Sequence, residues 1–544
     1  MMILLVSIDA KYIHTNLAVR YLKANSDFPV VIKEFTIKDD YQKILDSLVS
    51  LRPDVIGFSV YIWNVKIIKR LTSAIKDQIR TTIVWGGPEV SYEYDKCFKE
   101  APVDYIIAGE GELAFNQLLH ALEANQGLDL VPGLIYRENG NIIANKKRTI
   151  RDLSIIKDPY RLKEYQADIP HKIQYLELSR GCPFQCSYCL ASLDNSVRYF
   201  PLSRVTATID YLLSKGAKTF KFLDRTFNAK ESLAREMLAY VANLEALDIS
   251  FQFEITGDIL SDDFVEFVRR MPTKNRIRFE IGIQSLNDEA NILVHRRQDN
   301  KRLFSSIKKI QASENVDLHL DLIAGLPGED LQSFERTFNE TVSLFPKELQ
   351  LGVLKLLKGT LLRQESDKHR YIYNEQPPYE ISGSKYLSTS DMKKILLVEK
   401  MLNIYYNKGF MPNAIKWVLS NIASPFMFLL SLSEDWLKEG FGFSRYQLVD
   451  IFARFNEYID KHYPEISSES FALLKLDYLR YHKLKPKIWW KQIANKNEII
   501  RSFFDTNQTY PLEYLYKHAV VATYQDHYLI AVYGGIEPSI IHYS

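Results

Sequence analysis

The chain of 544 residues has room for roughly three to four domains of about 150 residues each, and 46% of its residues are hydrophobic, which suffices for buried cores. Its 69 lysines and arginines and 67 aspartates and glutamates give a net charge of +2, which excludes an overall field toward nucleic acid or an anionic membrane. Four cysteines in so long a chain exclude a disulfide scaffold and favour a reducing compartment.

The apolar start of the chain, residues 1–9, lacks a basic segment and a small-residue cleavage site. It therefore predicts a first strand and not a signal peptide. The most apolar later run, residues 426–432, is too short to cross a bilayer. We expect a cytoplasmic protein without a transmembrane segment.

A first domain is expected over residues 1–137, where brief β-branched runs alternate with amphipathic stretches. The predicted strands cover residues 3–8, 30–35, 55–60, 82–85 and 105–108. The predicted helices cover residues 16–24, 41–50, 66–78 and 113–124. This alternation predicts an α/β domain, a doubly wound parallel sheet with helices on both faces. Ligands of such sheets bind beyond the carboxyl ends of the strands.

Glycine-containing loops follow three of these strands, at residues 57–61, 85–89 and 109–112. Glycine lets a backbone approach a bulky ligand, and helix N-termini can donate to phosphates or amides, although the same loops also suit ordinary tight turns. His14, in the first loop, is interpreted as a loop or helix-cap residue. Cys97, between Lys96 and Lys99, is interpreted as a structural thiol.

After a connector over residues 138–167, a second domain is expected over residues 168–375. Six predicted strands cover residues 173–178, 219–223, 250–255, 278–283, 316–323 and 350–354. The predicted helices cover residues 205–215, 232–247, 262–270, 301–312 and 333–344. Six strand–helix units predict a partial (β/α)6 barrel with its reactive groups at the carboxyl ends of the strands.

Three of the four cysteines, Cys182, Cys186 and Cys189, follow the first barrel strand with the spacing C-x3-C-x2-C. So compact a trio can bind three irons of one cubane cluster and leave the fourth iron open to a small molecule. A structural zinc site needs four ligands, and no partner pair follows at zinc-finger spacing. Three unrelated cysteines at this spacing are the remaining alternative. The spacing favours the cluster.

At these residues the chain resembles the radical S-adenosylmethionine (SAM) enzymes, whose signature is C-x3-C-x-aromatic-C, with Tyr188 at the aromatic position. The resemblance implies a [4Fe-4S] cluster whose open iron is chelated by the amino and carboxylate groups of SAM. It also implies one-electron cleavage of SAM to methionine and a 5′-deoxyadenosyl radical. The electron would come from an external donor such as flavodoxin or ferredoxin.

SAM is zwitterionic, so its site needs a carboxylate or hydroxyl for the ammonium and ribose and an arginine for the carboxylate. After the second barrel strand, Asp224 and Thr226 stand where ordinary members of the superfamily carry a Gly-Gly-Glu-like element, which this chain lacks. Both side chains can form hydrogen bonds there, and we expect them to contact SAM.

The later strand ends resemble the oxygen-independent coproporphyrinogen oxidase branch of the superfamily. This resemblance implies that Glu254, Gln284 and Arg296 bind SAM, with Asp321 in a further polar role. Each charge taken singly could be a salt bridge at a barrel end. Four strand ends with the expected residue types in the expected order together predict a SAM site.

The sequence Ser-Arg-Gly-Cys-Pro at residues 179–183 resembles the subgroup that carries a cobalamin-binding domain in front of the barrel. The resemblance implies a flavodoxin-like first domain whose loops enclose cobalamin. The residues that match those loops are Ser59, Gly86, Gly87, Gly109 and Gly111. The chain departs from many cobalamin domains because residues 9–15 do not fit Asp-x-His-x-x-Gly, which leaves cobalamin binding open.

Residues 376–544 predict a mainly helical domain, with helices near residues 391–406, 446–462 and 467–480 and a strand near 527–535. Residues 477–491 mix cations with aromatics, and such a patch could bind RNA by phosphate contact and base stacking. A solvated basic edge beside a packed aromatic cluster is the favoured interpretation. This region resembles an uncharacterised extension behind some cobalamin-type radical SAM proteins, and we expect it to shape or cover the substrate end of the barrel.

The resemblances together imply a cobalamin-dependent radical SAM enzyme that transfers a methyl group to an unactivated carbon. A rearrangement, a ring contraction or another redox change would use the same parts. Two alternatives stay open: a radical SAM enzyme whose first domain does not bind cobalamin, and a cluster-bearing protein that binds RNA or protein. Nothing in the sequence identifies the substrate.

Overall fold

The computed structural model describes residues 1–246 and 248–544; residue 247, the last of the helix predicted over 232–247, lies outside the described residues. The chain forms two compact units. One comprises residues 1–329 and 352–388, and the other comprises residues 330–351 and 389–544. The predicted domain boundaries at residues 137, 167 and 375 stay predictions.

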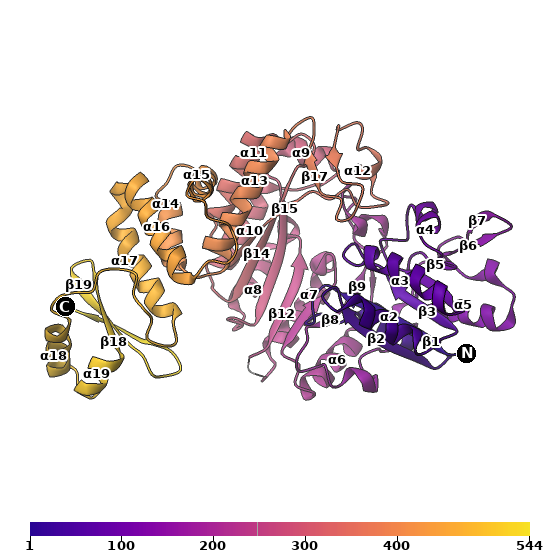
Figure 1. Ribbon diagram of the computed structural model, residues 1–544, viewed down its shortest axis with the longest axis horizontal. Helices are drawn as coiled ribbons and strands as arrows, with labels where there is room; N and C mark the ends of the chain where they lie inside the picture. The colour runs from indigo at the N-terminus through magenta and orange to yellow at the C-terminus, as the bar shows by residue number, and fades with distance from the viewer. Residues whose placement is uncertain (247) are drawn as a thin grey trace. The chain divides into compact units, whose positions relative to one another are not determined.

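The first unit begins with a sheet in the order β2-β1-β3-β4-β5-β6-β7, drawn in indigo and purple in Figure 1. Its first five strands pair in parallel, and the order 2-1-3-4-5 is that of the flavodoxin-like fold. The strands are β1 (Ile3–Asp9), β2 (Val30–Thr36), β3 (Val55–Ser59), β4 (Thr82–Gly86) and β5 (Tyr105–Ile107). The predicted doubly wound parallel sheet is confirmed.

Alternate residues of these strands pack against helices on opposite faces. Leu4 and Val6 share a buried cluster with α2, α3 and α4, whereas Ile3 and Leu5 share one with α1 and α5. Burial on both faces explains why the strands are almost continuously apolar. The helices are α1 (Leu17–Ala24), α2 (Tyr41–Val49), α3 (Val65–Gln78), α4 (Tyr94–Glu100) and α5 (Glu112–Ala124).

The sheet continues past residue 137 through an antiparallel hairpin of β6 (Leu134–Glu138) and β7 (Asn141–Ala144). Asn139 and Gly140 form its turn with φ values of 49° and 80°. Two consecutive left-handed residues give a turn whose twist matches the flanking strands. Short 3-10 helices lie before and after the hairpin: η1 (Leu128–Leu130), η2 (Leu153–Ile155) and η3 (Lys163–Tyr165).

The second sheet has six strands in the order β15-β14-β13-β12-β11-β8, so consecutive strand–helix units are neighbours. The pairs from β8 to β14 are parallel. The strands are β8 (Gln174–Leu176), β11 (Thr219–Phe222), β12 (Ser250–Ile255), β13 (Ile277–Gln284), β14 (Val316–Ala324) and β15 (Glu348–Val353). This open sequential sheet confirms the partial (β/α)6 barrel.

Helices and short elements lie between the barrel strands or follow the last of them, and they include two paired strands beside the cysteines. The bounds are β9 (Ser179–Arg180), η4 (Leu190–Leu193), β10 (Arg198–Tyr199), α6 (Leu202–Ser214), η5 (Phe227–Ala229), α7 (Glu231–Ala242), η6 (Gly257–Ile259), α8 (Asp262–Arg270), α9 (Asp288–Leu293), α10 (Asn300–Gln311), α12 (Leu361–Gln364), β16 (Ile372–Tyr373) and β17 (Ile381–Gly383).

One face of the barrel sheet is aromatic and fully buried. Phe220 and Phe251 stack there with ring centroids 4.5 Å apart, and Phe222 stacks on Phe253 at 4.7 Å. The residues between them, such as Lys221 and Gln252, are only partly buried, because successive side chains of a strand point to opposite faces. The opposite face of the sheet is therefore polar.

The second unit is mainly helical, as predicted, and ends in an antiparallel sheet in the order β18-β19-β20. Its elements are α11 (Leu331–Val342), α13 (Thr389–Met401), the π-helical turn η7 (Leu402–Asn407), α14 (Pro412–Ser420), α15 (Pro425–Lys438), α16 (Leu448–His462), α17 (Pro464–Tyr481), α18 (Lys496–Thr506), α19 (Leu512–His518), β18 (Ala519–Tyr524), β19 (His527–Val532) and β20 (Ser539–Tyr543).

Tyr478, Trp489 and Trp490 of the basic segment 477–491 pack against other rings of this unit, whereas Tyr481 is 48% exposed. The Trp489 ring contacts Phe452 and Phe471, and the Trp490 ring contacts Tyr478. Rings held edge to face by neighbours do not form an open stacking surface for bases. The segment fits a basic edge beside an aromatic cluster.

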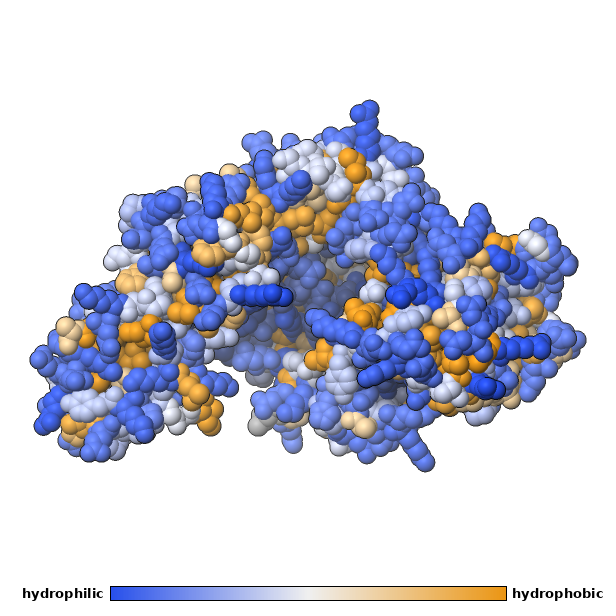
Figure 2. All heavy atoms as spheres, viewed as in Figure 1, coloured by the Kyte–Doolittle hydropathy of each residue, from blue (hydrophilic) through white to orange (hydrophobic). Residues whose placement is uncertain are grey.

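On the face of the molecule in Figure 2, hydrophilic residues cover most of the surface and hydrophobic residues form separate patches. No single helix among the described residues has the length and hydropathy of a membrane span. Helices α14 and α15 have the length and hydropathy of a span only when they are taken together, and they are bent by 117° at the break between them.

Candidate active site

The three cysteines lie in a loop that begins directly after β8 and β9, at the carboxyl end of the first barrel strand. Within the loop, the Cys189 N–H donates to the carbonyl of Cys186 at 3.0 Å, and the Cys182 N–H donates to the carbonyl of Asp194 at 3.0 Å. Gly181 has a φ of +89°, and a Cβ there would lie 2.3 Å from the Ser196 carbonyl oxygen. Only glycine fits at this turn.

The thiols share one small region of the loop. Cys182 and Cys186 are buried, and the Cys182 sulfur lies 3.5 Å from the Thr226 hydroxyl. Burial raises the pKa of the Cys189 thiol, and the charges of Cys186 and Cys182 raise it further, although Arg225 acts in the opposite direction. The three thiols form no disulfide, and an iron bound to them would itself lower their pKa and favour the thiolate form.

Among residues 1–246 and 248–544, no three His, Cys, Asp or Glu side chains converge on a point that could hold a single metal ion. A cubane requires a different arrangement from a zinc ion, since each of its thiolates binds its own iron. The donor chemistry of the loop, three thiols within eight residues, fits a [4Fe-4S] cluster with one iron left open.

Arg296 and Tyr188 lie together beside this loop. The Arg296 guanidinium is 3.5 Å from the Tyr188 hydroxyl and donates to the Gly282 carbonyl and to the Gln298 side chain, and the charge of Cys186 raises its pKa. These contacts place a fixed cation next to the cysteines, where a SAM carboxylate would need one.

Gln284 ends β13 in a strained conformation. Its φ is 65°, and the register of β13 against β14 shifts between Gly282 and Gln284. A Cβ at Gly282 would lie 2.3 Å from the Gln284 amide nitrogen. Left-handed backbone at a non-glycine residue is often found at functional sites. At Gln284 this backbone conformation interrupts the regular alternation of side chains along β13.

Glu254 and Asp321 lie on the polar face of the barrel sheet. Glu254 pairs in register with Glu280, which in turn lies opposite His319. Burial raises the pKa of Glu254, whereas Arg225, whose guanidinium is 3.8 Å from its carboxylate, lowers it. Asp321 lies 3.0 Å from the His319 imidazole, and burial raises its pKa as well.

Asp224 lies at the end of β11, where it was expected, and its contact with SAM stays a prediction. Its carboxylate is 1% exposed and accepts hydrogen bonds from the Leu178 N–H at 2.9 Å and from the Ser179 hydroxyl at 2.6 Å. Both oxygens therefore hold the strand end that leads into the cysteine loop. Thr226, 3% exposed, lies against the Cys182 sulfur.

A cavity of about 830 Å³ lies between the carboxyl ends of the first sheet and the cysteine loop. All five residues that resemble cobalamin-binding loops line it, together with Gly181, Leu190 and Arg225 from the barrel. These five are Ser59, Gly86, Gly87, Gly109 and Gly111. Four of them present backbone and no side chain to the cavity, which leaves room for a large ligand.

Polar and aromatic side chains complete the wall of the cavity on the side of the first sheet. Asn16 donates to Asp9 and to Ser59, at the ends of β1 and β3 where the strand order reverses. Tyr61 and Trp63 stack with ring centroids 4.4 Å apart and an interplanar angle of 5°. A flat aromatic pair and a hydrogen-bonding cluster fit a large ring with polar substituents.

Several charged residues that line the cavity were not predicted as site residues. Glu110 and Glu112 alternate with the predicted glycines, and Arg180 precedes the first cysteine by two positions. Arg225 follows Asp224 at the end of β11 and is 56% exposed. Their position at strand ends is the sequence signal that could have identified them. The prediction for these loops used only the glycines and so considered only backbone contacts with the ligand.

Three family models match parts of the chain. The model described as B12 binding domain matches residues 3–119, and that of the Radical SAM superfamily matches residues 176–341. The model described as a protein of unknown function (DUF4080) matches residues 367–528. The first two confirm the predicted order of modules and the predicted cofactor set of cobalamin, a [4Fe-4S] cluster and SAM.

Curated relatives include the uncharacterized methyltransferase PH0819 of Pyrococcus horikoshii, 30% identical over 326 residues. That alignment covers 57% of this chain and 68% of the relative. The cobalamin-dependent radical SAM methyltransferase TokK of Streptomyces tokunonensis is 24% identical over 311 residues, 54% of this chain and 45% of TokK. The chain therefore spans about two thirds of the first relative and under half of the second.

Two solved structures share the fold. TsrM from Kitasatospora setae, with cobalamin and a [4Fe-4S] cluster bound, gives a TM-score of 0.61 at 12% identity, over 80% of this chain and 98% of TsrM. OxsB, with aqua-cobalamin and SAM bound, gives 0.59 at 16% identity, over 87% of this chain and 79% of OxsB. These similarities confirm the predicted fold class.

Proposed function

Because the chain belongs to the cobalamin-binding radical SAM family, we propose that it is a methyltransferase that acts on an unactivated carbon of its substrate. The observation that carries this proposal is the cavity of about 830 Å³, which is lined at once by the glycine loops of the flavodoxin-like sheet and by the cysteine loop of the barrel. When bound, the cluster supplies the electron that cleaves SAM, and the corrinoid supplies the methyl group.

Cys182, Cys186 and Cys189 hold the cluster in this proposal. Arg296, fixed by Gly282 and Gln298, binds the carboxylate of SAM. Glu254 on β12 binds the SAM ammonium or ribose. Gln284, Asp321, Tyr188 and Thr226 complete the site, while Asp224 positions the loop through its hydrogen bonds with Leu178 and Ser179.

The five loop residues Ser59, Gly86, Gly87, Gly109 and Gly111 enclose the corrinoid. Their backbone and the stacked Tyr61 and Trp63 form part of the wall around the ring. His14 also lines the cavity, and its Nδ1 lies 2.7 Å from the hydroxyl of Tyr175. An external one-electron donor such as flavodoxin or ferredoxin reduces the cluster.

The test is anaerobic reconstitution of the full chain with iron, sulfide and hydroxocobalamin, followed by incubation with SAM and a strong one-electron reductant. We expect one cluster and one corrinoid per chain and the release of 5′-deoxyadenosine. A full cluster without corrinoid uptake would favour a radical SAM enzyme with a different first module. An intact cluster that never cleaves SAM would favour a binding protein.

A further inference from the structure

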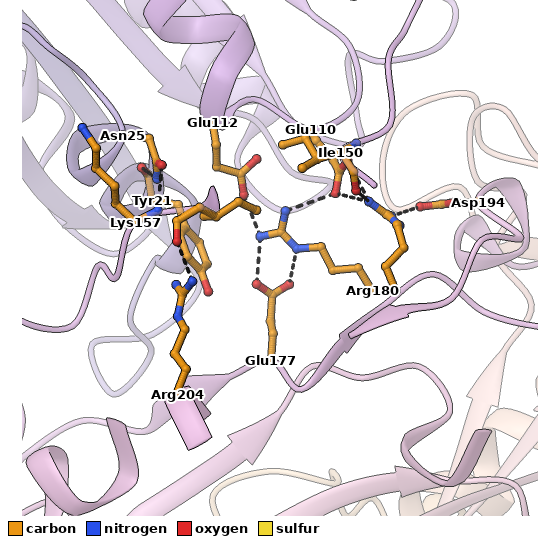
Figure 3. A network of polar contacts seen from close by, with 12 residues as sticks. Tyr21, Asn25, Glu110, Glu112, Ile150, Lys157, Glu177, Arg180, Asp194 and Arg204 are labelled. Atoms are coloured by element: carbon orange, nitrogen blue, oxygen red, sulfur yellow. Dashed lines mark hydrogen bonds and ion pairs between the residues drawn. The ribbon is translucent and has the colours of Figure 1, made fainter. Parts of the chain in front are cut away.

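Arg180 is surrounded by three carboxylates from two loops. Its guanidinium donates to both oxygens of Glu177 at 3.1 and 2.9 Å, to Glu110 at 3.1 Å, and lies 2.6 Å from Glu112. Figure 3 shows it between Glu112 and Glu177, with Glu110 reached by its other nitrogen. The Arg180 side chain is only 13% exposed, so these interactions are weakly screened by water.

Glu110 is the point where a second arginine joins. Its carboxylate also accepts from Arg198 at 2.9 and 3.0 Å and from the Ile150 N–H at 2.7 Å. Glu110 lies between Gly109 and Gly111, two of the residues that line the cavity. One carboxylate of the corrinoid loop therefore binds two arginines of the barrel.

Arg198 continues the connection to the first cysteine. It pairs with the Asp194 side chain, and the backbone carbonyl of Asp194 accepts the N–H of Cys182 at 3.0 Å. Arg180 reaches the same cysteine along the chain, through Gly181. Two short paths thus join the loop of Glu110 to Cys182.

A network of this kind has a positional effect that apolar packing would lack. Partly buried ion pairs lose as much by desolvation as they gain by attraction, so they are weak evidence for stability, whereas bidentate arginine contacts fix geometry. Arg180 contacts Glu177 with two nitrogens and Glu110 with its third, and one nitrogen of Arg198 donates to both oxygens of Glu110. The geometry they fix is the distance between two cofactor loops.

We propose that Glu110, Arg180 and Arg198 are positioning residues that couple the corrinoid loop to the cluster loop, so that each cofactor binds more tightly when the other is present. This rests on the proposed function, because it assumes that both cofactors bind. By linkage, the two effects must be equal in free energy. A coupling of about tenfold lies in the usual range for linked sites.

The test measures the dissociation constant of hydroxocobalamin by visible absorbance, with full-length protein in cluster-loaded and cluster-free forms. We expect wild-type protein to bind the corrinoid about tenfold more tightly when the cluster is present. Glu110→Gln should reduce that difference to less than about twofold while both cofactors still bind. Glu123→Gln changes an exposed residue of α5, the helix that follows the Glu110 loop, and should retain the full difference.

A second variant keeps the test decisive if Glu110→Gln does not fold. Arg180→Lys keeps the charge but loses the guanidinium fork, so it should fall between wild type and Glu110→Gln. Equal corrinoid affinity of the two wild-type forms, or full coupling in Glu110→Gln, would overturn the proposal. If wild-type protein binds no corrinoid in either form, the proposed function itself fails, and this outcome is distinct from lost coupling.

Discussion

The hydroxyl of Ser179 donates a 2.6 Å hydrogen bond to the carboxylate of Asp224, from the strand end before the cysteine loop to the end of the neighbouring barrel strand. The second oxygen of the same carboxylate accepts the Leu178 N–H. A residue expected to contact SAM is thus part of the frame that supports the cluster loop. The cluster loop depends on a residue 45 positions away from Ser179 in the chain.

Asp224 makes the stability of the protein depend on pH. Its pKa is raised to about 7, chiefly by burial and also by the charge of Glu177, while the hydrogen bonds from Ser179 and Leu178 lower it. An aspartate in the unfolded chain titrates near 4. The contribution of protonated Asp224 to the free energy of unfolding is therefore complete below about pH 4 and is lost as the pH rises through about 7.

We expect Asp224→Asn to remove this dependence. The measurement is the midpoint temperature of thermal unfolding of anaerobic apoprotein at pH 5 and at pH 8. Between these two pH values the midpoint temperature should decrease more in wild type than in the variant. Asp210→Asn changes an exposed carboxylate of α6 and serves as the control. Parallel curves for wild type and Asp224→Asn would contradict the assignment.

The cysteines of the loop should be essential for iron, whereas Cys97 should not. Cys97 is 1% exposed within the core of the first sheet and far from the loop in the chain. We expect Cys186→Ala to abolish most of the iron–sulfur absorbance after anaerobic reconstitution, because a cubane held by two thiolates loses a ligand to one iron. Cys97→Ala should retain the full iron content. Equal iron in both variants would refute the cluster site.

Much of the fold follows from local sequence patterns. Ile3, Leu5 and the alternate residues Leu4 and Val6 are buried on opposite faces, and a continuous apolar run predicts such a strand. The cysteine spacing likewise locates the loop after β8. The β6–β7 hairpin was not predicted, although Asn139-Gly140 is a strong turn signal between two apolar runs.

The contacts between distant segments could not be predicted in the same way. Asp224 ends a strand in the expected place, but the direction of its carboxylate depends on Leu178 and Ser179. The partners of Arg180 come from separate segments of the chain. A sequence motif predicts which residue types stand at one strand end. It does not predict which charged residues pair, because that depends on which strand ends become neighbours in the fold.

Gly87 should tolerate no side chain. Its φ is +121°, and a Cβ would lie 2.5 Å from the Val60 carbonyl oxygen, which is backbone and cannot rotate away. We expect Gly87→Ala to destabilise the protein by roughly 3 kcal/mol or more, from backbone strain and overpacking together, and to impair corrinoid uptake. The measurements are thermal unfolding and hydroxocobalamin titration.

Gly127→Ala separates strain from the clash at Gly87. Gly127 has a φ of +80°, but no atom lies within 4 Å of the position that a Cβ would take, so only the backbone penalty of about 1–2 kcal/mol applies. Corrinoid uptake should be unchanged in Gly127→Ala. Equal losses in the two variants would show that the contact with Val60 has no effect.

Glu89 and Lys358 form a buried ion pair between the loop after β4 and the segment after β15. The Lys358 nitrogen lies 2.8 Å from the Glu89 carboxylate, and the side chains of Lys358 and Glu89 are only 7% and 5% exposed. Because either charge alone would be buried without its partner, Lys358→Met should cost about 3–5 kcal/mol. The double variant Glu89→Gln/Lys358→Met should lose much less than the sum of the two single variants. Additive losses in thermal unfolding would mean that the pair is not coupled.

Arg225 should determine the pH range in which SAM binds. Burial raises the pKa of Glu254, the charges of Glu280 and Asp321 raise it further, and Arg225 and Lys221 lower it. Removal of Arg225 therefore moves the pKa of Glu254 upward, and a protonated Glu254 cannot pair with the SAM ammonium.

We expect Arg225→Gln to lose affinity for SAM as the pH falls, with a midpoint at higher pH than in wild type. The measurement is equilibrium dialysis of SAM against cluster-loaded protein between pH 5 and pH 8. Arg235→Gln removes a cation of α7 that lies 3.7 Å from Glu231, and its pH curve should match that of wild type. Because the two variants lose the same charge, a shift in Arg225→Gln alone would come from its carboxylate neighbour. Superimposed curves for Arg225→Gln and wild type would exclude Glu254 as the carboxylate that binds SAM.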